Sequence, residues 1–271
     1  MNTVLTILKD HATLVQIILY LAVIITIWLA ELRLTILSLR EKWRHTYVNL
    51  KFVMAALPIQ LTLTFFVIFV SGWVTIHKWG LLYLLPHHNS FWIKYVVGFF
   101  LMDFFEYVYH VCMHKVKTLW GFHLIHHTDL QMDVSTTIRE HPGETFIRVC
   151  FQILWVFLSG ASIGLLLLRQ TVQTFANLIA HTHYQLPKRA DKIFGLLFIT
   201  PNLHHVHHHF ELPYTDCNYG DVFSIWDRML GTYRELNISE IKFGLDVYEG
   251  HSATDFSDLI KFPFLKRDDP N

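Results

Sequence analysis

The chain has 271 residues, of which 52% are hydrophobic and 16% are charged. Soluble domains usually carry about 25% charged residues, so this composition, with a mean hydropathy of +0.33, excludes an ordinary soluble globule. The 22 basic and 22 acidic residues cancel, which gives no electrostatic reason to expect a nucleic-acid partner. The three cysteines form no Cys-x-x-Cys pair and no even disulfide framework, which is consistent with a reducing, cytoplasm-facing active region.

Two apolar stretches near the N-terminus predict membrane-spanning helices. Residues 12–30 contain no charged residue over the roughly twenty positions that a bilayer-spanning helix needs. A cleaved signal peptide is disfavoured there, because the stretch follows Lys9-Asp10-His11 rather than a basic segment. Residues 52–72 predict a second span, in which we expect Pro58 to introduce a kink.

Basic residues between the two spans predict the orientation of the chain. We expect them to lie in a short cytoplasmic loop, because such loops carry an excess of Lys and Arg. The connection 73–94 would then be external, and a third apolar run, 95–109, would return the chain to the cytoplasmic side. The basic residues concerned are Arg33, Arg40, Lys42, Arg44 and Lys51.

A fourth hydrophobic region, 146–181, is expected to form a helical hairpin that turns near 159–164. The histidines before and after it must lie on one side of the membrane if they build one site. Arg169 and Gln170 interrupt its second arm, so we expect the hairpin to enter only part of the bilayer. Residues 182–271 are polar enough to form a cytoplasmic cap.

Histidines are concentrated in the middle of the chain, with thirteen of the nineteen between positions 110 and 209. Residues three or four apart share one face of a helix, and imidazoles at that spacing can clasp a metal ion. A lone histidine is usually a hydrogen-bonded, partly buried residue, and a single His-rich run is usually a surface tract. Neither explains three clusters with helical spacing, which therefore predict a built metal site. The clusters are His110 and His114; His123, His126 and His127; and His204, His207 and His208.

The number of histidines predicts two metal ions. Eight clustered imidazoles, with His181 as a ninth, exceed what one ion accepts, since a structural zinc takes four protein ligands and a catalytic one takes three. Imidazole binds iron, copper, nickel and zinc alike, so the ligands alone do not identify the metal.

Polar residues near the clusters are expected to support the ligands. A ligand histidine usually donates its second N–H to a carboxylate or carbonyl. Asp103 and Glu106 precede His110 by one or two helical turns and are the first candidates. Asn177, four residues before His181, is expected to ligate a metal through its amide oxygen or only to form a hydrogen bond. Further candidates are Glu140, Glu144, Asp216, Asp221 and Asp227.

Three classes of membrane protein that use histidines are weighed against these clusters. A metal transporter usually places its ligands near the middle of its spans, where this chain has none. A zinc-dependent hydrolase usually has a Glu between its ligands, as in His-Glu-x-x-His, and these clusters enclose none. A haem carrier needs only one or two axial histidines per haem. The transporter and the hydrolase remain open as functions for such a site.

The histidine motifs resemble those of the fatty acid hydroxylase superfamily, also called the sterol desaturase family, whose members are integral-membrane non-haem di-iron enzymes. The resemblance runs from about Asp103 to Tyr233, close to half of the chain. His-x3-His at 110–114 and His-x2-His-His at 123–127 look like the first two histidine boxes of the family. The same spacing at 204–208 looks like its third box.

Three further segments carry the resemblance. The segment STTIREHPGE, residues 135–144, is similar to an Arg-x-His-Pro signature and contains His141. The segment HTHYQLP, residues 181–187, resembles a family segment in which Asn usually stands at the position of His183. Asn-Tyr-Gly and Ser-Ile-Trp-Asp-Arg-Met-Leu-Gly-Thr, both within residues 218–232, resemble the closing motif.

The resemblance implies an O2-dependent oxidation of a lipid C–H bond, by hydroxylation, desaturation or ether cleavage of a fatty acyl, sterol or related lipid from the bilayer. It implies two iron ions held by the clustered histidines, with zinc as a substitute in purified protein. Catalytic roles are expected for His141, Asp103, Glu106 and Asn177. The chain has no Gly-rich dinucleotide fingerprint and too few cysteines for an iron–sulfur cluster. A separate electron donor is therefore expected, either a ferredoxin or a cytochrome b5-like protein with its reductase.

The expected fold is an all-α integral membrane protein with about four transmembrane or partly inserted helices. A cytoplasmic, histidine-rich helical cap would hold the dinuclear metal site. We expect an N-terminal transmembrane region over 1–109 and a hydroxylase-like catalytic domain over 103–235, which includes the membrane hairpin near 146–181. Residues 236–271 would form a C-terminal cytoplasmic tail.

Overall fold

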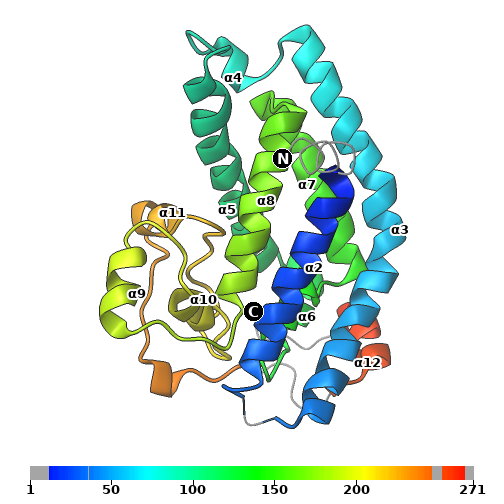
Figure 1. Cartoon of the computed structure of the whole chain (residues 1–271), viewed down its shortest axis with the longest axis vertical. Helices are drawn as coiled ribbons and strands as arrows, with labels where there is room; N and C mark the ends of the chain where they lie inside the picture. The colour runs from blue at the N-terminus through cyan, green and yellow to red at the C-terminus, as the bar shows by residue number, and fades with distance from the viewer. Residues whose placement is uncertain (1–11, 36, 246–251, 266–271) are drawn as a thin grey trace, which may run out of the picture.

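The computed structural model describes residues 12–35, 37–245 and 252–265. These ranges contain helices and no β-strand, which confirms the all-α class. Five long helices run side by side and give the molecule an elongated shape, with most of the shorter helices gathered at its lower end (Figure 1). The long helices are α2 (Ala12–Glu31), α3 (Leu39–His77), α5 (Gly98–Lys115), α7 (Pro142–Ser159) and α8 (Ile163–Ala180).

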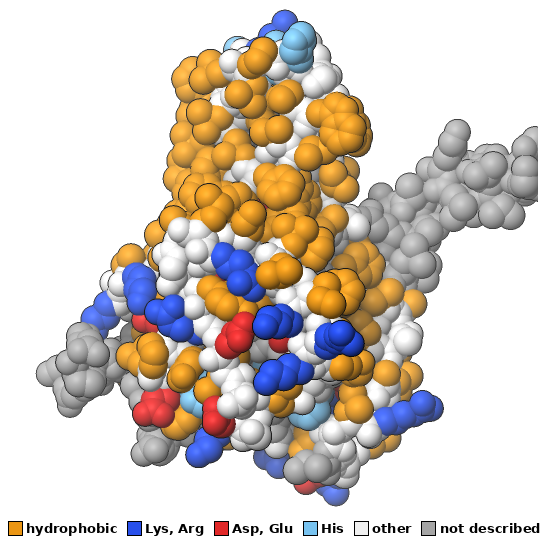
Figure 2. Space-filling view, turned by 90° about the vertical axis from the view of Figure 1, so that its left-hand side faces the viewer, with side chains coloured by type: hydrophobic (Ala, Val, Ile, Leu, Met, Phe, Trp, Pro, Cys, Tyr) orange, Lys and Arg blue, Asp and Glu red, His pale blue; other side chains and the backbone are white. Residues whose placement is uncertain are grey.

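Three helical segments among the described residues are long and apolar enough to cross a membrane. The helix α3 runs into the short α4 (Leu81–Leu84), and a π-helix, η1 (Trp92–Val97), continues directly into α5. Hydrophobic side chains cover the upper part of the molecule, whereas Lys, Arg, Asp and Glu side chains gather on its lower part (Figure 2). The three segments are Leu39–Leu84, Trp92–Lys115 and Ile163–Ala180.

Helix α3 corrects the expectation of a basic loop before the second span. A capping box begins the helix: the Ser38 hydroxyl accepts a hydrogen bond from the Glu41 amide, and the Glu41 carboxylate accepts one from the Ser38 amide. Its 39 residues extend over about 58 Å at 1.5 Å per residue, nearly twice the roughly 30 Å of a bilayer core. Residues 39–51 therefore extend the helix below its apolar part.

The expected hairpin is present as the pair α7 and α8. The first arm ends at Ser159 and the second begins at Ile163, with Gly160 in the left-handed conformation between them at φ 78°. Gly80, at φ 109°, packs against this turn so closely that a Cβ on it would lie 2.3 Å from the Gly160 amide nitrogen. The upper turns of the bundle therefore touch at two glycines, where no larger residue fits without displacing backbone.

Buried ion pairs explain the charges that looked out of place in the sequence. Arg169, in the second arm of the hairpin, is buried and pairs with Glu106 on α5 at 2.7 Å. Lys42, at the lower end of α3, is also buried, and its ammonium group lies 2.8 Å from Glu31 and 2.7 Å from Asp133. Since a buried charge needs a partner, these pairs fix the arrangement of the helices that carry them.

The short helices of the lower end enclose the histidine-bearing segments. The C-terminal segment packs against them: Leu259 and Phe262 are buried in a cluster with Val48 and Leu124, and the Ala253 carbonyl accepts a hydrogen bond from Arg139. The described part of the expected tail is therefore a packed element of the cap. The short helices are α6 (Lys117–His127), η2 (Val134–Ile138), α9 (Lys188–Phe194), α10 (Pro201–His207), α11 (Ile225–Leu230), η3 (Ile238–Glu240), α12 (Phe256–Lys261) and η5 (Phe262–Phe264).

Candidate metal centre

All nine histidines predicted as metal ligands come together at the lower end of the bundle, in two groups. Within each group, one ring nitrogen of every histidine lies within 4.8 Å of one ring nitrogen of every other. The first group is His110, His114, His123, His127 and His207, and the second is His126, His181, His204 and His208.

Helical spacing explains how two short helices serve both groups. On α6, His123 and His127 are one turn apart and face the first group, while His126 turns toward the second. The third cluster reverses this pattern, because His204 and His208 join the second group and His207 the first. In a helix, residues i and i+4 lie on one face, and residue i+3 lies at the edge of that face. The repeated spacing therefore produces two adjacent nitrogen clusters.

Backbone carbonyls fix the orientation of at least three of the rings. The Nδ1 atom of His110 donates to the Tyr219 carbonyl at 2.9 Å. The Nδ1 atom of His207 donates to the Cys217 carbonyl at 2.7 Å, and that of His181 to the Asn177 carbonyl at 2.9 Å. A carbonyl can only accept, so the proton of each neutral ring lies on Nδ1 and Nε2 carries a lone pair.

These Nε2 lone pairs point at other imidazole nitrogens. His181 Nε2 lies 3.0 Å from both His126 Nε2 and His204 Nε2, and His110 Nε2 lies 3.2 Å from His123 Nε2. Two nitrogens bound to the same ion at about 2.1 Å lie about 3.0–3.4 Å apart. The spacing therefore fits two ligands of a common cation better than two lone pairs that face each other without one.

Unsatisfied nitrogens support the same interpretation. Within the described ranges, the Nε2 atoms of His114, His207 and His208 are buried and have no hydrogen-bond partner. Buried polar atoms are normally satisfied, so nitrogens aimed into a cluster of other imidazoles indicate a site that accepts a metal ion.

Two carboxylates support ligands of the first group. His123 Nδ1 lies 2.6 Å from Glu144 Oε1, and His114 Nδ1 lies 3.3 Å from Asp216 Oδ1. Burial lowers the pKa of His123 to about 3 and that of His181 to about 4. The rings are therefore neutral near pH 7, which is the state that binds metal.

Asp103 and Glu106, the first candidates for this supporting position, have other partners. Asp103 accepts hydrogen bonds from Trp226 Nε1 at 2.7 Å and from the Val222 amide at 3.3 Å, and Glu106 pairs with Arg169. Asp103 lies two turns from His110, so it contacts α11 and the segment just before it instead of an imidazole.

The other two expected catalytic residues, His141 and Asn177, also make contacts of other kinds. The Nδ1 atom of His141 accepts a hydrogen bond from the Gly143 amide at the start of α7, and Nε2 donates to the Ile260 carbonyl. Both nitrogens of His141 are thus engaged away from the two histidine groups. Asn177 supports His181 through its backbone carbonyl, and its side chain faces the cavity next to the site.

Histidines outside the spacing pattern lie around the site without joining either group. His205 donates from Nε2 to the Thr182 carbonyl, and the Nδ1 atom of His209 accepts a hydrogen bond from the Lys242 amide. The His183 amide donates to Glu31 at 2.8 Å. These contacts stabilise the loops that carry the ligands.

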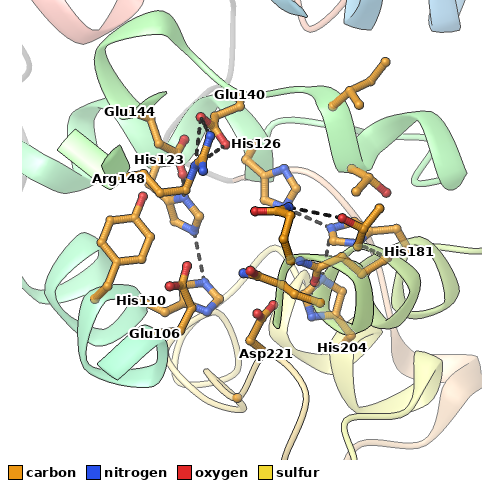
Figure 3. A pocket seen from close by; sticks show the side chains of 18 residues that line it. Glu106, His110, His123, His126, Glu140, Glu144, Arg148, His181, His204 and Asp221 are labelled. Atoms are coloured by element: carbon orange, nitrogen blue, oxygen red, sulfur yellow. Dashed lines mark hydrogen bonds and ion pairs between the residues drawn. The ribbon is translucent and has the colours of Figure 1, made fainter. Parts of the chain in front are cut away.

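A cavity of about 310 Å³ opens beside both groups. His110 and His123 of the first group and His126, His181 and His204 of the second line it (Figure 3), whereas the other four histidines of the two groups do not. The other lining residues labelled in Figure 3 are Glu106, Glu140, Glu144, Arg148 and Asp221. A substrate in this cavity would face both groups from one side.

Comparison with known proteins agrees with the motifs. The family model described as fatty acid hydroxylase matches residues 95–232, which is just over half of the chain and includes all nine ligands. The protein belongs to the fatty acid hydroxylase family. No solved structure matches the chain.

Curated relatives of this family member act on several lipids. The chain is 31% identical over 156 residues to the ornithine lipid hydroxylase OlsE of Rhizobium tropici, an alignment that covers 55% of this chain and 46% of that one. It is 32% identical over 136 residues to the alkylglycerol monooxygenase of Caenorhabditis elegans, an alignment that covers 49% of this chain and 26% of that one. It is 28% identical over 163 residues to human cholesterol 25-hydroxylase, covering 60% and 57%. The alignments thus span about half or less of the length of the first two relatives.

Proposed function

We propose that the protein is a membrane-bound, O2-dependent oxidoreductase that holds one iron ion in each histidine group and oxidises a C–H bond of a lipid. The observation that carries this proposal is the pair of nitrogen clusters whose lone pairs face one another. Membership of the fatty acid hydroxylase family supports it, as do relatives named as lipid hydroxylases and monooxygenases.

The residues of this chain prepare the site in three ways. The carbonyls of Tyr219, Cys217 and Asn177 hold a proton on Nδ1, so that Nε2 is free to ligate. Burial keeps the rings neutral and excludes water from the ligand nitrogens. The adjoining cavity holds the substrate on the open side of both groups. Bound there, iron would supply the redox chemistry that activates O2.

Orientation and electron supply are part of the proposal. The basic extension of α3 below its apolar part supports a cytoplasmic position for the histidine end. Because the sequence has no dinucleotide fingerprint, we propose that electrons come from a separate ferredoxin or cytochrome b5-like donor.

A zinc-dependent hydrolase is the second proposal, because one observation favours it. The carboxylates of Glu106, Glu144 and Asp221 line the cavity, although no Glu lies between the ligands in the sequence. A carboxylate near a metal-bound water can act as a general base.

One experiment separates the two proposals. The full chain, purified in lipid nanodiscs, is analysed for metal and then given a chemical reductant, O2 and an extract of host lipids. We expect bound iron and O2 uptake coupled to the appearance of an oxidised lipid. Bound zinc with no O2 uptake, together with cleavage of an ester or amide, would replace the oxidoreductase with the hydrolase.

A further inference from the structure

Side chains that carry a polar group line most of the cavity beside the histidine groups. Of its 18 lining residues, all of which lie in the described ranges, only Ile138 and Gly220 lack a polar side-chain group. Ligand pockets are usually lined mainly by apolar side chains. A hydrocarbon chain here would leave buried polar atoms such as Asp221 Oδ2 without a hydrogen-bond partner, which is unfavourable.

One wall of the cavity is a polar stripe on α8. Gln170, Gln173, Thr174 and Asn177 all line the cavity, and their spacing of three and four puts them on one helix face. This stripe lies on a segment otherwise apolar enough to cross a membrane. Asp221 lines the same cavity, and its Oδ2 atom is buried without a hydrogen-bond partner in the described structure. Hydrogen-bonding groups therefore surround the space in front of the histidines.

An apolar opening adjoins this polar cavity. It has a volume of about 230 Å³ and lies between α3 and the start of α7, with Phe52, Val53, Ala56 and Leu57 on the α3 side. The two cavities share the lining residues Thr137, Ile138, Glu140 and Arg148. The opening thus leads from the apolar part of α3 to the polar cavity.

A polar cluster marks the junction of the two cavities. Arg148 pairs with Glu140 at 3.1 Å, and its Nη2 atom donates to Gln60 Oε1 on α3 at 2.9 Å. Polar side chains on one side of this junction and apolar ones on the other match the two ends of an amphiphile.

We propose that the substrate is an amphiphilic lipid that binds with a hydrogen-bonding head group in the polar cavity and with its hydrocarbon chain in the opening between α3 and α7. The oxidised carbon then belongs to the head group or adjoins it, and does not lie far along the chain. This inference rests on the proposed function and specifies which part of the lipid lies next to the histidine groups.

The position of the added oxygen tests the inference. The full chain is expressed in a bacterial host with an electron donor, and the lipids are fragmented by tandem mass spectrometry. We expect the added oxygen on head-group fragments. Oxygen on carbons in the middle or at the end of an acyl chain would overturn the inference but leave the oxidoreductase in place. The absence of any O2-dependent product would count against the proposed function instead.

Lipid binding tests the inference without turnover. Native mass spectrometry of the metal-loaded protein compares monooleoylglycerol with methyl oleate, which has the same chain and no hydroxyl groups. We expect monooleoylglycerol to bind more tightly. The double variant Gln173→Leu, Thr174→Val should weaken its binding about three- to tenfold, the range for one or two lost hydrogen bonds, and should leave methyl oleate unaffected. Equal binding of both lipids, unchanged in the variant, would overturn the inference.

A matched pair of variants on α3 tests the opening. Leu57 lines it, and Leu61, one helical turn further on, is 65% exposed on the outer face of the bundle. Leu57→Trp should weaken the binding of both lipids at least threefold, whereas Leu61→Trp should change neither. Equal effects of the two variants would contradict the placement of the chain between α3 and α7.

Discussion

The orientation of each histidine in the two groups depends on what its second ring nitrogen contacts. The grouping of the nine histidines could be predicted from the sequence, because their spacing of three and four is a local property of a helix. Their partners could not all be predicted. The carbonyls of Tyr219 and Cys217 carry no side-chain signal, and Tyr219 lies 109 positions from His110. Glu144 was one of several acidic candidates until the fold placed it 2.6 Å from His123.

At the scale of single residues, His126→Ala tests whether the two histidine groups are separate metal sites. His126 belongs to the group of four, so its loss leaves three ligands there and all five in the other group. We expect the bound metal to fall by about half and O2-dependent activity to be lost, as measured by elemental analysis and O2 uptake. His205→Ala, which removes a histidine outside both groups, is the control. Full metal content and turnover in His126→Ala would contradict the assignment.

The supporting carboxylate gives a second test. Glu144→Gln removes the carboxyl group beside His123 but keeps the shape, and we expect metal affinity to fall about 10–100-fold, as for other lost partners of ligand histidines. Asp103→Asn is the matched control, because Asp103 bonds Trp226 and Val222 rather than a ligand. A metal titration in which Asp103→Asn has the larger effect would restore Asp103 to the role first expected of it.

Among the elements, α3 differs most from its sequence-based prediction. Its apolar part could be predicted from composition alone, but its first thirteen residues look like a basic loop because Arg and Lys are frequent there. A helix forms because Ser38 and Glu41 cap it and because Lys42 finds Glu31 and Asp133 in the folded protein. Such long-range pairing is not visible in a local sequence pattern.

Lys42→Met tests the importance of this pairing. The variant leaves the buried carboxylate of Glu31 without its cation and leaves Asp133 with His45 alone, at 3.6 Å. Breaking a buried pair in this way usually costs about 3–5 kcal/mol. We expect a clearly lower unfolding temperature in detergent. Arg44→Met, two residues away at an exposed position, should change stability by no more than about 0.5 kcal/mol. Equal unfolding temperatures for the two variants would show that the ion pairs do not stabilise the junction of α2, α3 and η2.

At the scale of the whole molecule, the face in Figure 2 is mostly hydrophobic in its upper part, and most of its charged side chains lie in its lower part. The all-α class and the hairpin could be predicted, because both follow from runs of apolar residues and their interruptions. The cavity and the packing of the C-terminal segment could not be predicted, because both are built from side chains that meet only after folding. Leu259, for example, is buried beside Val48 and Leu124, more than 130 positions away in the sequence.

The lengthwise division leads to a prediction about topology. If the membrane surrounds the upper part, the connection near Asn89 and the histidine end near Lys188 lie on opposite sides, whereas Lys115 and Lys188 share a side. We expect epitope tags at positions 115 and 188 to be reached only after the cell membrane is permeabilised, and a tag at position 89 to be reached in intact cells. Tags at 115 and 188 on opposite sides would be incompatible with one shared metal centre.

The metal content of the purified full-length chain tests the central claim most directly. Elemental analysis of protein made in iron-supplemented medium, combined with an accurate protein concentration, should give two ions per chain, one for each histidine group. A chain that folds and stays intact but binds no stoichiometric metal would contradict the account.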